Sequence, residues 1–229
     1  MSARVLPLNG IDGPKSSTAM VADDIRLRIT SGRLPLGSRI SDKLIAAELA
    51  MSRTPVREAL VMLQSEGLVV MRPQSGTFVV DLTADDIRQI CAARSILETG
   101  ALKLAAAGEA TEIAVRLGLI VSHAAVALAD GDLAACDELD CRFHETLVAE
   151  SSNSYLQKAY SALSDRLRAL RHRLPLEHDR IARALAQHRQ ILDFWTLGRI
   201  DNALSELSTH VGNVEQLLTA AKNDNANCA

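Results

Sequence analysis

Residues 52–60 read SRTPVREAL, and this stretch predicts a helix with one apolar face and one basic face. Val56 and Leu60 recur at a spacing of four, so their side chains lie on the same side of the helix and point to a core. Ser52 stands directly before the pattern, where serine is a favoured N-cap residue. We therefore expect a helix from about residue 53 to residue 66.

The first turn of this helix carries the groups that a DNA-reading helix needs. Arg53 and Arg57 lie four residues apart on a face away from the core, and Ser52 and Thr54 add two hydroxyls. Arginine offers paired donors to guanine edges or to phosphates, and the free N–H groups of a first turn favour a phosphate. Pro55 is tolerated because those N–H groups have no helical partner. The alternative is a solvated arginine face paired with nearby glutamates.

The surrounding sequence favours the DNA-reading interpretation. Residues 17–32 show a helical pattern, and Ser41 can cap a second, short helix. Two alternating runs, at 68–71 and 77–80, follow the third helix and indicate a hairpin. Three helices followed by a two-stranded wing predict a winged helix-turn-helix domain over residues 16–81.

The same segment resembles the GntR family of bacterial regulators over about residues 16–80. The resemblance rests on Gly37-x-x-Ile40, on residues 52–60, on Glu66-Gly67-Leu68 and on Gly76-x-Phe78-Val79. The family usually has proline directly before the turn glycine, whereas Leu36 stands there in this chain. The resemblance implies a transcriptional repressor that binds a double-stranded, pseudo-palindromic DNA operator. We expect a homodimer, because a two-fold protein on such an operator doubles the contacts.

The resemblance also implies which residues contact DNA. Arg53 and Arg57 would contact bases or phosphates, and Ser52 and Thr54 would contact phosphates. Lys43 would contact the backbone or a base, and the wing tip would approach the minor groove. The expected DNA-binding residues are Lys43, Ser52, Arg53, Thr54, Arg57 and Gly76.

The remainder of the chain shows helical patterns only. They span roughly 83–107, 109–129, 131–150, 152–173, 178–197 and 200–222. We therefore predict a mainly α fold, in which an antiparallel bundle of six or seven helices over residues 83–222 follows the winged domain. Residues 1–15 and 223–229 show no periodicity, and we expect both segments to be disordered.

Four residues in this second part have the chemistry of metal ligands. Asp140 and His144 lie four apart, on one face of a predicted helix, and His188 and His210 lie in two later helices. Three imidazoles and a carboxylate suit Zn²⁺, at ~2.0–2.2 Å per bond. From spacing alone, a surface Asp–His hydrogen bond and two core histidines remain the alternative. His123 and His178 are interpreted as surface residues.

These residues also resemble the ligand-binding domain of the FadR subgroup of GntR regulators, of the FCD type. The matching runs are Arg94-x-x-Leu97-Glu98, Asp140-x-x-Phe143-His144, Asn153, His188-x-x-Ile191-Leu192 and His210. The resemblance implies a divalent metal ion in an internal cavity, held by Asp140, His144, His188 and His210. Zinc is the expected ion, with nickel, manganese and iron as alternatives.

A small carboxylate is the expected effector, because a carboxylate oxygen can complete the coordination of a bound cation. Arg94 would then pair with the second carboxylate oxygen, and Asn153 would donate a hydrogen bond to the ligand. Two alternatives stay open: Arg94 pairs with Glu98 on the bundle surface, and Asn153 caps its own helix. A further alternative makes the metal ion itself the effector.

Charge and composition limit the remaining classes. Residues 15–80 hold nine Lys/Arg and six Asp/Glu, whereas residues 81–229 hold fifteen and twenty-one, so the basic part is the predicted DNA reader. We find neither ~20 uninterrupted apolar residues nor a secretory signal, and expect a cytoplasmic protein without a membrane partner. A metal-dependent hydrolase is disfavoured because no residue has a clear claim to act as general base, so we expect no enzyme.

Overall fold

Three short helices begin the described chain: α1 (Ser17–Thr30), α2 (Asp42–Glu48) and α3 (Arg53–Ser65). The structure is a computed structural model that describes residues 15–108 and 110–227, with side chains as far as residue 222. Helix α3 packs on α1 and α2, and their apolar faces meet in one core around Ile25 and Val56. The predicted helix over 53–66 is confirmed to within one residue.

The wing is a hairpin of β2 (Val69–Arg72) and β3 (Gly76–Val79), which pair antiparallel. A third strand, β1 (Arg39–Ile40), pairs with the other edge of β3, so the sheet has the order β1-β3-β2. The prediction of a two-stranded sheet is therefore corrected to three strands. A strand of two residues is too short to show an alternating pattern in the sequence.

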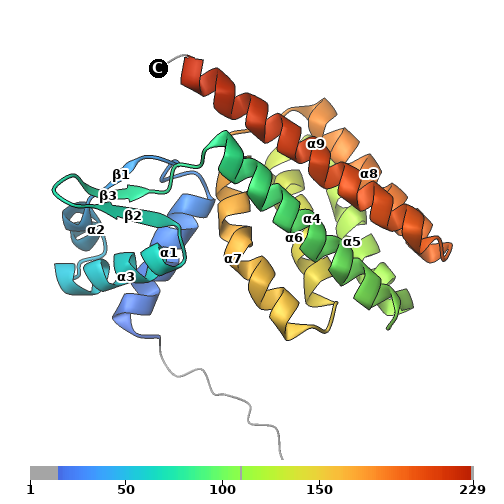
Figure 1. Cartoon of the computed structure of the whole chain (residues 1–229), viewed down its shortest axis with the longest axis horizontal. Helices are drawn as coiled ribbons and strands as arrows, with labels where there is room; N and C mark the ends of the chain where they lie inside the picture. Colours follow the sequence, from blue (N-terminus) through green and yellow to red (C-terminus); the bar gives the residue numbers. More distant parts are fainter. Residues whose placement is uncertain (1–14, 109, 228–229) are drawn as a thin grey trace, which may run out of the picture.

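The C-terminal part is a helical bundle, which confirms the predicted mainly α fold (Figure 1). Helix α9 packs against α4 and α8, and α5 packs against α6 and α8. Of the expected six or seven helices, the described residues form α4 (Ala84–Ala106), α5 (Ala110–Ala129), α6 (Leu133–Ala149), α7 (Ser154–Arg171), α8 (His178–Thr196) and α9 (Ile200–Asn227).

The two ends of the chain were both expected to be disordered. The N-terminal segment 1–15 lies outside the described residues except for Lys15. At the other end, α9 continues to Asn227, well into the predicted tail of 223–229, and residues 228–229 are not described. A helix that is already nucleated adds one hydrogen bond per further residue, so polar residues can extend it without an apolar pattern.

Helix α5 is long and apolar enough to cross a membrane by length and composition, with a mean hydropathy of 1.6. The sequence contains no run of ~20 uninterrupted apolar residues, and Glu112 and Arg116 lie within α5 itself. In the structure α5 packs within the bundle, where Leu117 and Ile120 share a core cluster with Phe143 of α6. Only part of its apolar surface therefore contributes to the bundle core, because Val115, Leu119 and Val126 are exposed.

Helix α7 joins the two parts of the molecule, and Figure 1 shows it beside α1. Ala169 of α7 is buried within the core of the winged domain. Arg166 donates to the carbonyl oxygens of Glu66 and Gly67 at 2.9 and 3.1 Å. A side chain at Gly67, which has φ +73°, would collide with the Arg166 guanidinium, so the glycine permits this contact. Helix α3 thus ends against the bundle.

Candidate functional site

Three helices of the bundle bring the predicted metal ligands together. Asp140 and His144 lie one turn apart on α6, His188 lies on α8, and His210 lies on α9. All four are buried, and their ligand atoms lie within 4.8 Å of one another. The spacing of Asp140 and His144 places both on the inner face of α6, because residues four apart are neighbours on a helix.

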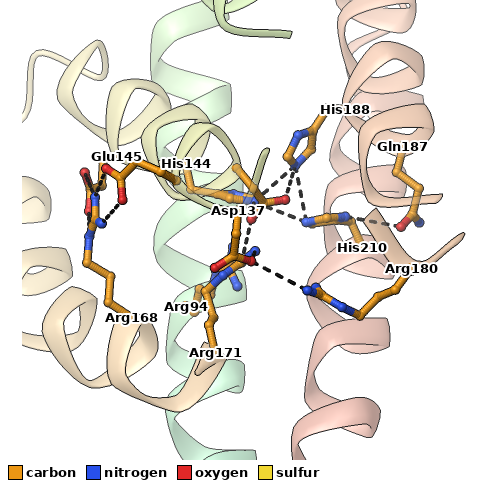
Figure 2. A network of polar contacts seen from close by, with 12 residues as sticks. Arg94, Asp137, His144, Glu145, Arg168, Arg171, Arg180, Gln187, His188 and His210 are labelled. Carbon is orange, nitrogen blue, oxygen red and sulfur yellow. Dashed lines mark hydrogen bonds and ion pairs between the residues drawn. The ribbon is translucent and has the colours of Figure 1, made fainter. Parts of the chain in front are cut away.

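The three imidazole Nε2 atoms point to one place, as Figure 2 shows for the labelled rings. The distances between Nε2 atoms are 3.1 Å for His144 and His210, 3.2 Å for His144 and His188, and 3.3 Å for His188 and His210. Asp140 approaches from α6, with Oδ1 3.6 Å from His188 Nε2 and Oδ2 3.9 Å from His144 Nε2.

Two of the rings are oriented by partners behind them. Nδ1 of His144 lies 2.8 Å from Oε2 of Glu98, and Nδ1 of His210 lies 3.2 Å from Oε1 of Gln187. Both partner oxygens accept, so both Nδ1 atoms carry the proton and the Nε2 lone pairs face inward. Phe143 stacks on the third ring, that of His188, with centroids 4.0 Å apart.

This donor set fits a divalent metal ion. Two inward lone pairs only 3.1 Å apart repel each other unless something electropositive lies between them. Ligand atoms ~2.0–2.1 Å from a tetrahedral zinc ion lie ~3.3 Å apart, which is close to the observed spacing of the nitrogens. A carboxylate bonded to the rear nitrogen of a ligating histidine is the common support of such sites, and Glu98 has that place.

The protonation states suit a cation as well. Burial lowers the pKa of His188 to about 3 and holds the pKa of His210 well below its usual value, so both rings are neutral at physiological pH. Burial alone would raise the pKa of Asp140, but the Arg171 guanidinium and the three neighbouring imidazoles together outweigh burial and hold this pKa well below its usual value. Arg171 Nη1 lies 2.5 Å from Asp140 Oδ2.

Arg94 lies inside the bundle and pairs with a carboxylate of the protein itself. Its Nε donates to Glu98 Oε1 at 2.7 Å, and the Tyr160 hydroxyl donates to the same oxygen at 2.9 Å. The alternative in which Arg94 pairs with Glu98 is therefore confirmed for the partner. Its placement of the pair on the bundle surface is wrong, because both side chains are buried. Through Glu98, Arg94 supports the His144 ring.

Asn153 lies at the start of α7, where its side-chain oxygen accepts from the backbone N–H groups of Tyr155 and Leu156. This is the helix-cap alternative that the sequence left open. The two expected effector residues thus occupy separate places, one behind the His144 ring and one at a helix end.

A groove of about 670 Å³ between α8 and α9 opens onto the cluster through Asp140 and His210. Three of its lining residues are arginines, Arg171, Arg180 and Arg183. Sequence reasoning missed all three, because arginine on a helix is normally solvated. Only the three-dimensional structure distinguishes them: Arg171 and Arg180 are buried, and Arg183 lies on the wall of the groove.

The predicted DNA contacts lie on exposed positions of α2 and α3 and on the wing. Arg53, Arg57, Thr54 and Lys43 are exposed, and the hydroxyl of Ser52 makes no cap hydrogen bond. Gly76 has φ +114°, which favours glycine, at the wing turn.

Two features of this surface were not predicted. Asp42 holds both arginines: its Oδ2 lies 2.8 Å from Arg53 Nη2 and 2.9 Å from Arg57 Nε. Arg39 of β1 is exposed, and its Nε would lie 3.1 Å from a Cβ atom placed on Gly76, so the guanidinium adds a positive charge beside the wing turn. Only the pairing of β1 with β3 brings Arg39 there.

Comparison with known proteins agrees with this arrangement. Residues 17–79 match the family of bacterial regulatory proteins called the gntR family, and residues 89–213 match the FCD domain. The chain is 31% identical to the gluconate operon transcriptional repressor of Bacillus subtilis, over 86% of this chain and 82% of the relative. It is 32% identical to a probable D-xylose utilization operon transcriptional repressor of Paenarthrobacter nicotinovorans, over 84% of each.

A solved structure shares the whole architecture. The crystal structure of a putative transcriptional regulator GntR from Rhodococcus sp. RHA1 superposes with a TM-score of 0.77 at 26% identity, over 89% of this chain and 98% of the other. These relatives are transcriptional regulators, which agrees with the expectation that the chain is not an enzyme. The chain belongs to the GntR family of bacterial transcriptional regulators, and its helical part is an FCD domain.

Proposed function

We propose that this protein is a ligand-responsive repressor of the FadR subgroup, whose helical domain binds a divalent metal ion and a small organic acid. The observation that carries the proposal is the convergence of three buried Nε2 atoms within 3.3 Å of one another. Asp140, His144, His188 and His210 would hold the ion. Zinc is the expected metal, with nickel, manganese and iron as alternatives.

The ion would supply a fixed positive charge and a coordination position for a carboxylate oxygen. The groove beside Asp140 and His210 supports an acid effector over the alternative in which the metal alone is sensed. A pure metal sensor needs no cavity beyond the ion, whereas about 670 Å³ accommodates an organic molecule.

The winged domain would place the first turn of α3 in the major groove of an operator, with Arg53 and Arg57 towards bases or phosphates. Lys43, Ser52 and Thr54 would add contacts around them, and Gly76 would bring the wing to the minor groove. We propose a homodimer acting in the cytoplasm, because a two-fold protein on a pseudo-palindromic operator doubles these contacts.

Titration calorimetry tests the sensing half of the proposal. Zinc-loaded wild-type protein and His188→Ala are titrated with a panel of small organic acids, and metal content is measured on both. We expect an acid to bind the wild type with a measurable heat, and to bind His188→Ala much more weakly because the ion is lost. Equal binding to both proteins would reject metal-dependent sensing, and retention of zinc by His188→Ala would reject the ligand set.

A further inference from the structure

Arg180 is a buried guanidinium without a full set of partners. The side chain begins in the first turn of α8, and its Nε donates to the carbonyl oxygen of Pro175 at 3.1 Å. Its Nη2 makes no hydrogen bond within the part of the chain that the structure describes, although the whole residue is only 8% exposed. The nearest carboxylate oxygen, Oδ1 of Asp137, lies 3.7 Å from Nη2, which is too long for a hydrogen bond.

A buried, incompletely bonded arginine is costly, so it indicates a missing anionic partner. Asp137 does not fill this role, because its Oδ1 already accepts from Arg171 Nη2 at 3.0 Å. Arg171 in turn is engaged by Asp140. Asp137 and Asp140 both pair with Arg171, and Nη2 of Arg180 is left without an acceptor among the described residues.

The groove carries an excess of positive charge around this open donor. Arg171, Arg180 and Arg183 line it, and Asp140 is the single acid among the lining residues identified in the described chain. Arg183 is exposed and has no hydrogen bond or ion pair within the described residues, which places a free guanidinium on the same wall. An anion in the groove would meet both.

Arg180 is also close enough to the cluster for one small molecule to reach both. Arg180 Nη2 and Arg171 Nη2 contact the same oxygen of Asp137, at 3.7 and 3.0 Å, and Arg171 Nη1 contacts Asp140. Arg180, Asp140 and His188 line one small cavity together.

We propose that the effector is a dicarboxylic acid, one carboxylate of which reaches the metal cluster while the other is bound by Arg180, with Arg183 as a second contact. This inference rests on the proposed function and narrows the effector class from organic acids to dicarboxylic acids. Arginine suits the task because its planar donors match a carboxylate in pairs. Arg180 and Arg183 thus determine specificity for diacids over monoacids.

The test uses acids that differ by one carboxylate. Glucarate is compared with gluconate, and glutarate with pentanoate, by calorimetry on the zinc-loaded full chain. We expect the diacid of at least one pair to bind the wild type at least ~10-fold more tightly, because hydrogen bonds to charged groups are strong. Arg180→Gln should remove this preference, whereas affinity for the monoacid and zinc content stay unchanged.

Two further variants keep the test sharp. Arg183→Gln should also reduce the preference for the diacid over the monoacid. Because Arg183 is exposed, this variant tests the role of the groove even if Arg180→Gln does not fold. Arg189→Gln, at an exposed position of α8 outside the groove, should behave as the wild type. Tight binding of monoacids with no effect of either groove arginine would overturn the inference and leave the proposed function standing. Failure of every acid to bind would overturn both.

Discussion

Arg171 and His172 are consecutive residues that contact different parts of the molecule. Arg171 Nη1 lies 2.5 Å from Oδ2 of Asp140, in the predicted metal site, and His172 Nε2 donates to the carbonyl oxygen of Thr30, in α1, at 2.7 Å. Successive side chains on a helix point in different directions, so the end of α7 can touch both. A ligand that moves Asp140 therefore has a short path to the winged domain.

Loss of the His172 contact should weaken communication between the two parts. In His172→Ala we expect zinc affinity to stay within about twofold of the wild type, because His172 is no ligand, while the effect of zinc and acid on operator affinity becomes smaller. Couplings of this kind amount to ~1–3 kcal/mol. Operator affinity is measured by fluorescence anisotropy with and without metal and acid.

His123→Ala is the matched control, because His123 is an exposed histidine on α5. An unchanged response to zinc and acid in His172→Ala would show that signals do not pass through this contact.

Replacement of Glu98 should weaken metal binding although Glu98 is not one of the ligands. Glu98→Gln removes the charge that accepts the His144 Nδ1 proton at 2.8 Å, and such supporting groups affect metal affinity ~10–100-fold. Zinc affinity is measured by competition with a chromophoric chelator. Tyr160→Phe loses only the hydroxyl that donates to the other Glu98 oxygen, and we expect it to bind zinc as the wild type does. Equal zinc affinity in both variants would contradict the support role of Glu98.

A separate prediction concerns Arg53, in the first turn of α3. Arg53→Ala should weaken operator binding by ~1–3 kcal/mol if Arg53 contacts a base. Gel-shift titration against the operator and against a sequence with one altered half-site distinguishes base reading from phosphate contact, since a phosphate contact weakens both complexes alike. Arg189→Ala, an exposed arginine on α8 in the bundle, is the control. Wild-type affinity in Arg53→Ala would remove Arg53 from the interface.

The metal-free protein should lose stability as the pH falls below 6.5. Burial lowers the pKa of His188 from its ordinary value of 6.5 to about 3, and lowers that of His210 in the same direction. Between pH 6.5 and the lowered pKa values, the unfolded chain binds more protons than the folded chain. The free energy of unfolding therefore decreases as the pH is lowered. The slope approaches ~1.4 kcal/mol per pH unit for each ring. Urea denaturation with a chelator at pH 7.5 and 5.5 measures it.

For the pH dependence, His178→Asn serves as control, because it removes an exposed histidine that lies outside the buried cluster. The same free energy of unfolding at both pH values would mean that the buried rings are not held neutral.

The sequence determined the elements that depend on local pattern. A contiguous run, residues 52–60, specifies the amphipathic helix, its cap and its two arginines, because side chains four apart share a helical face. The same rule placed Asp140 beside His144. The order of helices and hairpin followed from periodicity and turn residues, which act within a few positions of the chain.

Only the tertiary structure decided which distant residues meet. His188 and His210 join the pair on α6 because α8 and α9 pack together, and spacing along the chain carries no record of that packing. Burial decided the rest: Arg94 and Glu98 form an internal pair, and Arg180 keeps an unbonded donor beside the cluster. A charged side chain changes its role when water is removed around it, because an uncompensated charge is then costly, and the sequence does not record where water is excluded.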